Sequence, residues 1–138
     1  MKSLVLTIAM LSVGAFAVLQ AEVIAAAPTD AVARGEYLAV SVVQCIQCHS
    51  PHDREGNLLR DQLFTGQAMP FTSPYPEGPR WAARAPAIKR LPGWSIEEFV
   101  SILTTGKRLN GRRPASPMPQ FRMSTQDAEA VAAYLKSL

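Results

Sequence analysis

Two cysteines and a histidine stand close together in the order Cys45, Cys48, His49, and the chain contains no other cysteine. The spacing C-x-x-C-H is the pattern at which c-type haem is attached. Residues three apart on a helix face the same side, so both sulfurs can form thioethers along one edge of the porphyrin. His49 then lies over the ring, where its imidazole can bind the iron. The pattern predicts a covalent haem on Cys45 and Cys48, with His49 as its proximal ligand.

Two other chemistries use the same residue types. A C-x-x-C pair also forms the redox disulfide of thioredoxin-like proteins, but that interpretation expects a βαβ context, which the flanking sequence lacks. A zinc site could combine the three residues with His52. It would require adjacent Cys48 and His49 to turn to one ion, and no second ligand pair follows at zinc-finger spacing. Haem attachment is favoured over both.

Residues 1–27 have the pattern of a secretory signal peptide. Lys2 gives a positive start, an apolar run covers residues 4–19, and three alanines end at Ala27. The run is short for a bilayer span of about 20 residues. We expect cleavage after Ala27 and a single domain at residues 28–138, located in the periplasm. The alternative is an uncleaved anchor that tethers the same domain to the outer face of the membrane.

The formal net charge is +3, with no long run of like charges. Lys2 and Glu22 cancel if the signal is removed, so the domain keeps this charge. No nucleic-acid partner is expected. Membrane association is expected only if the N-terminal segment is uncleaved. No constellation of catalytic side chains accompanies the haem motif, so we expect no enzyme activity.

The first of three helical patterns covers about residues 29–48, with Thr29 or Asp30 as a cap. Gly35 lies inside it. A glycine weakens a helix interior, so it indicates either close approach by another backbone or a tolerated defect.

Two further helices have clear start signals. Ser95 and Glu98 form a capping box, and Gly106 stands where that helix should end. Ser124 can cap a last helix that covers about residues 125–138. The three helices predict an all-α fold.

Prolines recur from Pro51 to Pro92 and argue against extended helix there. A structureless connection of this length normally counts against a compact domain. An irregular chain can nevertheless wrap a cofactor whose apolar faces replace a packing partner, whereas disorder is the competing interpretation. Apolar side chains available to line the cofactor are Leu58, Leu59, Leu63, Phe64, Phe71 and Trp81.

Three methionines follow His49 and could bind the iron from its other side: Met69, Met118 and Met123. A methionine opposite histidine is known from cytochromes c and raises the reduction potential. Met118 lies in Ser-Pro-Met-Pro at 116–119, where the prolines should keep the segment extended and hold the side chain at the ring. We therefore predict Met118 as the distal ligand. Core filling suits Met69 and Met123 better.

The chain resembles the class I, single-haem c-type cytochromes of bacteria, and is similar to haem domains of periplasmic dehydrogenase cytochrome subunits. Besides the haem motif, the matching stretches lie at 35–38, 93–99, 105–107, 116–124 and 133–138. The resemblance implies a cytochrome c-like fold, with three or more helices and long irregular loops wrapped around one covalent haem c. It also implies that His49 and Met118 are the axial ligands, and that the N- and C-terminal helices cross near Gly35 and Tyr134.

Related sequences often carry an Asn-x-Thr-Pro-Asp-like stretch before the Gly-Trp element, where this chain has Ala-Pro-Ala-Ile-Lys-Arg at 85–90. The haem carboxylates are anions that need hydrogen-bond donors when buried. Our hypothesis is that Trp94 or Trp81, or else Arg80 or Arg84, supplies one. The alternatives are core packing for the tryptophans and solvated surface for the arginines.

These features predict a periplasmic protein that carries single electrons between redox protein partners. The candidate partners are a periplasmic dehydrogenase and a terminal oxidase. One alternative is an obligate haem subunit of such a complex. Another is a sensor or peroxidase-like enzyme with an open sixth site. A positive rim before Met118 could steer an acidic partner, or be only a solvated loop. Its residues are Lys107, Arg108, Arg112 and Arg113.

Overall fold

The computed structural model describes residues 31–75, 78 and 80–138. The predicted signal peptide and the predicted caps Thr29 and Asp30 lie outside these residues. Along the described chain the elements are α1 (Ala31–Glu36), the π-helix η1 (Tyr37–Val42), α2 (Cys45–His49), the 3-10 turn η2 (Arg60–Gln62), β1 (Gln67–Ala68), β2 (Arg84–Ala85), α3 (Ile96–Thr105) and α4 (Thr125–Ser137).

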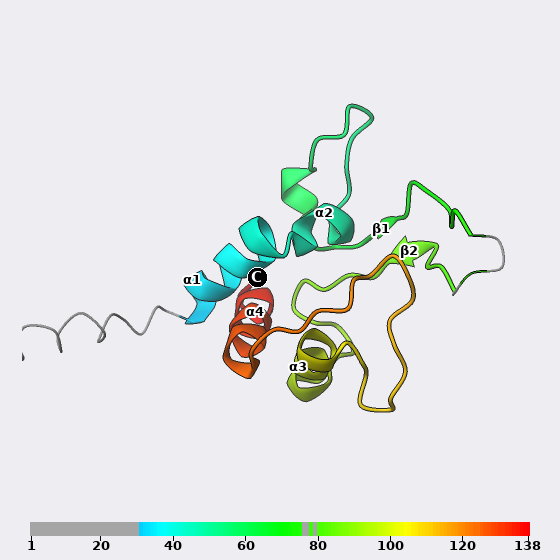
Figure 1. Cartoon of the computed structure of the whole chain (residues 1–138). Helices are drawn as coiled ribbons and strands as arrows, with labels where there is room; N and C mark the ends of the chain where they lie inside the picture. Colours follow the sequence, from blue (N-terminus) through cyan, green and yellow to red (C-terminus); the bar gives the residue numbers. More distant parts are fainter. Residues whose placement is uncertain (1–30, 76–77, 79) are drawn as a thin grey trace, which may run out of the picture.

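Helices and long irregular segments dominate the fold, and the only sheet among the described residues pairs β1 with β2 (Figure 1). The prediction of a helical fold with long irregular loops is therefore confirmed. Within the described residues, no helix is both long and apolar enough to cross a bilayer.

The first predicted helix is interrupted at Gln44. The helical chain of α1 and η1 ends at Val42, and the N–H of Val43 donates to the carbonyl of Leu38 at 2.8 Å. Gln44 then has a left-handed backbone, with φ 57° and ψ 38°, before α2 begins. Valines are poor helix formers because their branched side chains crowd the preceding turn. The prediction of one helix reaching Cys48 is wrong, and the haem motif stands on a separate short helix.

α1 and α4 approach each other closely at Gly35. A Cβ atom on this residue would overlap the carbonyl oxygen of Ala130 and lie 2.8 Å from the Cβ of Tyr134. Glycine is required here by the approach of the second backbone. This confirms the expected crossing near Gly35 and Tyr134. The ion pair between Arg34 and Asp127, at 2.9 Å, also joins α1 to α4.

The two later helices begin and end where the sequence predicts. The hydroxyl of Ser95 accepts from the N–H of Glu98 at 3.0 Å, and that of Ser124 accepts from the N–H of Asp127 at 3.1 Å. α3 stops at Gly106, whose φ of 71° ends the helix in a left-handed conformation.

One hydrophobic core joins the helices to the proline-rich region. Its largest fully buried side chains include Phe64, Leu103, Val131 and Leu135. The ring of Phe64 packs edge-on against Tyr134, with centroids 5.9 Å apart. Phe64, one of the side chains available to line a cofactor, is part of this core.

We expect Gly35→Ala to lower the free energy of unfolding by about 1–3 kcal/mol, because the added methyl meets a backbone carbonyl that cannot rotate away. Ala33→Gly on the exposed side of α1 is the control, and it should cost no more than about 1 kcal/mol. Denaturant unfolding of the haem-loaded proteins, followed by circular dichroism, measures both. A Gly35→Ala protein as stable as the parent would show that the crossing tolerates a side chain.

Candidate haem site

α2 carries the complete haem motif on a helix of 5 residues. Cys45 is half-buried and Cys48 is exposed, and the two form no disulfide. Their spacing of three residues on one helix places both on the same side of it. Before haem attachment, burial raises the pKa of the Cys45 thiol to about 11.

The imidazole of His49 is held by a carbonyl group. Its Nδ1 lies 2.7 Å from the carbonyl oxygen of Pro86. Because a carbonyl oxygen can only accept, Nδ1 carries the proton and Nε2 is left with a lone pair for a metal. Burial lowers the pKa of His49, against the opposing effect of the hydrogen bond to Pro86. The neutral imidazole in this tautomer is the form that an axial haem ligand needs.

His52 is not directed at the same point as His49. Its ring nitrogens face the side-chain oxygens of Gln67, at 3.2 Å, and Gln47, at 3.4 Å. Within the ranges 31–75, 78 and 80–138, no group of three or more His, Cys, Asp or Glu side chains is arranged to hold a metal ion. The four side chains that the zinc alternative requires are therefore not arranged around one ion.

Residues 80–86 connect the haem motif to the segment of Met118. At one end, Pro86 accepts the hydrogen bond of the His49 ring. Near the other end, two backbone hydrogen bonds of 2.6 and 3.1 Å join residues 82 and 80 to Ser116, two positions before Met118. Figure 1 shows this orange segment, which precedes α4, running up to β2. The same short stretch of chain thus contacts the segments of both predicted axial ligands.

Met118 lies at a turn. Its N–H donates to the carbonyl of Ala115 at 3.2 Å, and the peptide bond between Ser116 and Pro117 is cis. The expectation of an extended segment is wrong, because this hydrogen bond reverses the chain across Pro117. The side chain of Met118 is half-buried.

The other two methionines occupy different surroundings. Met123 packs against the helical core, and its N–H donates to the carbonyl of Leu103 at 3.0 Å. Met69 lines a hollow of about 260 Å³ together with Phe71 and Trp81.

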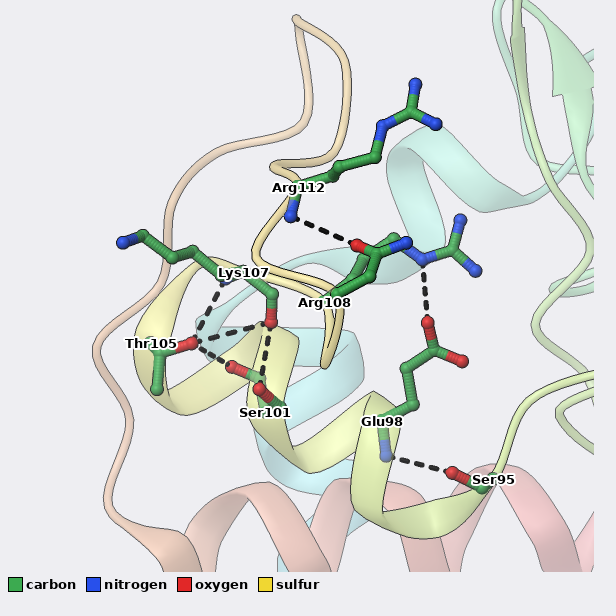
Figure 2. A network of polar contacts seen from close by, with 8 residues as sticks. Ser95, Glu98, Ser101, Thr105, Lys107, Arg108 and Arg112 are labelled. Atoms are coloured by element: carbon green, nitrogen blue, oxygen red, sulfur yellow. Dashed lines mark hydrogen bonds and ion pairs between the residues drawn. The ribbon is translucent and has the colours of Figure 1, made fainter.

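The loop between α3 and Met118 is fixed by Arg108. Figure 2 shows its guanidinium turned to Glu98, with Nε 2.7 Å from the carboxylate oxygen. The guanidinium also lies over the ring of Trp94, 4.7 Å from its centroid. The carboxylate of Glu98 therefore pairs with Arg108, and only the backbone N–H of Glu98 takes part in the N-terminal cap of α3. The exposed members of the predicted basic rim are Lys107, Arg112 and Arg113.

Trp81 offers a hydrogen bond that the chain does not accept. Its Nε1 is the only buried side-chain nitrogen or oxygen without a partner among the described residues. Its ring packs edge-on against Phe71, with centroids 6.1 Å apart. A buried N–H left unpaired costs about 1–3 kcal/mol, so this position suits an acceptor from outside the chain. A haem carboxylate is such an acceptor, and the donor set thus fits a haem.

Three residues of this site escaped the sequence reasoning: Pro86, Gly66 and Gln67. Gln67 pairs with Ala85 across the two strands, so all three lie around one ribbon next to α2. Strands of two residues have no periodicity to detect. The only available signal was a glycine within the proline-rich region, and Gly66 has a φ of +83°.

Residues 32–138 match the family model described as cytochrome c. The matched region contains the haem motif, the connecting segment 80–86, Met118 and α4. No curated protein matches the chain.

The variant Trp81→Phe tests whether the indole N–H of Trp81 has an acceptor in the haem-loaded protein. If a haem carboxylate accepts this hydrogen bond, Trp81→Phe should destabilise the haem-loaded protein by about 1.5–3 kcal/mol, as expected for a bond to a charged group. If the N–H has no acceptor, Trp81→Phe should cost no more than the loss of ring volume, which Trp94→Phe measures. Trp94→Phe, which keeps a ring under Arg108, is the matched control. Denaturant unfolding followed by haem absorbance measures both.

Proposed function

The chain belongs to the cytochrome c family and is a c-type electron-transfer protein with covalently bound haem c, and from this premise we propose an exported carrier of single electrons with His49 and Met118 as axial ligands. When bound, the haem supplies a one-electron Fe(II)/Fe(III) couple. Cys45 and Cys48 form the thioether bonds in this proposal. The pattern of residues 1–27 supports a location in the periplasm.

His49 serves as the proximal ligand through Nε2. The hydrogen bond from Nδ1 to Pro86 holds the ring in one orientation and increases its basicity. Because the ring is buried and neutral, it is ready to coordinate without first losing a proton. The bond to Pro86 would therefore hold the ring in the same orientation for both oxidation states of the iron.

Met118 serves as the distal ligand. The observation that carries this assignment is the connecting segment 80–86, which is bonded both to the ring of His49 and to Ser116. Met123 lacks this connection, because its N–H is bonded to Leu103 of α3. Met69 shares part of it, since its N–H donates to the carbonyl of Ala83 at 2.9 Å, so Met69→Ala is the decisive control for the assignment. A thioether is a soft, uncharged ligand that favours reduced iron, so a His/Met pair gives a high reduction potential suited to an electron carrier.

The redox partner in this proposal presents an acidic surface, as part of a periplasmic dehydrogenase or a terminal oxidase. Arg108 is paired with the carboxylate of Glu98, so it contributes less to the rim than the sequence suggested. The exposed charges of Lys107, Arg112 and Arg113 remain on the loop between α3 and Met118. Such charges speed the encounter with an acidic surface without making the complex long-lived.

We expect Met118→Ala to lower the reduction potential by on the order of 0.1 V, within the range of about 0.8 V that axial ligands control. Loss of the thioether removes the preference for reduced iron and opens the sixth position. Redox titration measures the potential, and carbon monoxide added to the reduced protein should bind promptly to the variant and slowly to the parent.

Met69→Ala and Met123→Ala are the controls for this ligand assignment. Both should keep the potential and the slow carbon monoxide binding of the parent. If either behaves as expected for Met118→Ala, that methionine is the ligand instead. Prompt binding by the parent itself would favour the sensor or peroxidase-like alternative.

The double variant Arg112→Gln, Arg113→Gln tests the positive rim without an identified partner. The reduced variant should be oxidised severalfold more slowly by anionic hexacyanoferrate(III), and faster by a cationic cobalt(III) complex, because local charge steers small oxidants. Arg54→Gln with Lys136→Gln removes the same charge from other exposed positions and should change both rates less. Equal effects in the two double variants would rule out a local rim.

A further inference from the structure

The carbonyl groups at the end of α2 are bound by residues far along the chain. A helix this short leaves its last carbonyls without partners of its own. The side-chain amide of Gln67 donates to the carbonyl oxygens of Gln47, at 3.0 Å, and Cys48, at 3.2 Å. The N–H of Gly66 donates to the carbonyl oxygen of His49 at 2.7 Å. Two adjacent residues therefore bind three successive carbonyls of the haem motif.

The orientation of the Gln67 amide follows from its partners. Carbonyl oxygens only accept, so the NH₂ group must face Gln47 and Cys48. The amide oxygen then faces Nδ1 of His52 at 3.2 Å, and this nitrogen donates to it. Both ends of the amide are thus engaged, and the side chain is held in one position.

The ribbon that carries Gln67 also holds the ring of His49. Gln67 pairs with Ala85, the residue before Pro86, whose carbonyl accepts from the imidazole. A Cβ on Gly66 would come within 2.7 Å of the oxygen of Ala85 and 2.8 Å of the carbonyl carbon of Pro86, so the two strands lie close together. The backbone and the ring of His49 are consequently bound from a single two-stranded unit.

We propose that Gln67 is a positioning residue for the proximal ligand, which sets the angle of the His49 imidazole at the iron and, through it, the reduction potential. Partners outside the metal ligands orient those ligands and tune the metal. The inference rests on the proposed function in requiring a haem bound through His49. It does not depend on which residue is the distal ligand.

The variant Gln67→Met tests this role, because it keeps the length of the side chain and removes both N–H donors without adding charge. Loss of these donors leaves two carbonyl oxygens more negative near the iron, which favours the oxidised state. We expect the equilibrium constant for reduction to fall at least about threefold, or about 28 mV for one electron. The haem-methyl proton shifts of the oxidised protein, which report the orientation of axial ligands, should change as well.

Gln62→Met is the matched control. Gln62 is exposed in η2, and its side chain makes no hydrogen bond within the described part of the chain. The potential and the methyl shifts of this variant should equal those of the parent. If a folded Gln67→Met protein also keeps both parental values, Gln67 only supports the fold and the proposal is overturned.

If Gln67→Met does not fold, Gln67→Asn replaces it. The shorter amide cannot reach both carbonyls from the same backbone position, so the methyl shifts and the potential should change in the same direction. Parental values in folded Gln67→Asn would again overturn the proposal. Failure of the distal assignment is recognised separately, because it appears as prompt carbon monoxide binding by the parent protein, by Met69→Ala or by Met123→Ala.

Discussion

The hydrogen bond from the ring of His49 to the carbonyl of Pro86 is the constraint around which the site is arranged. It fixes the proton on Nδ1 and leaves Nε2 for the iron. Proline suits this position because it offers a carbonyl and no N–H. It also restricts the preceding residue to extended backbone, which is the conformation of Ala85 in β2. The pairing of β1 with β2 therefore places this carbonyl, and the bond depends on the loop as a whole.

The proline-rich loop is anchored to the helical core at Phe64. The N–H of Phe64 donates to the hydroxyl of buried Ser50 at 2.9 Å, and its carbonyl accepts from Ile88 and Lys89 at 2.9 and 3.0 Å. Phe64 has a φ of 61°, a backbone conformation that a bulky residue adopts only when its surroundings enforce it. These bonds therefore hold the loop in place next to the haem motif, although most of its residues form neither helix nor strand.

Local signals in the sequence were sufficient for the haem motif, for α3 and for α4. Ser95 and Ser124 act within three residues of themselves, so their roles can be read from a short stretch of chain. Gln44 could not be identified as a break, because a left-handed backbone at glutamine depends on the packing of the helices on either side. Pro86 and Gln67 were missed for a similar reason: each acts on a distant residue, and no pattern in the sequence marks the partner. The turn at Met118 likewise depends on contacts with residues 80 and 82.

The crossing of α1 and α4 has a consequence for the order of assembly. Gly35 contacts α4, which follows the other elements of the described chain, so the core cannot close until α4 has been synthesised. The motif Cys45-x-x-Cys48-His49 is made much earlier. Throughout that interval α2 lacks the ribbon that later binds its carbonyls. The order of elements thus leaves the thiol of Cys45, which is half-buried in the folded chain, open to solvent until the core has closed.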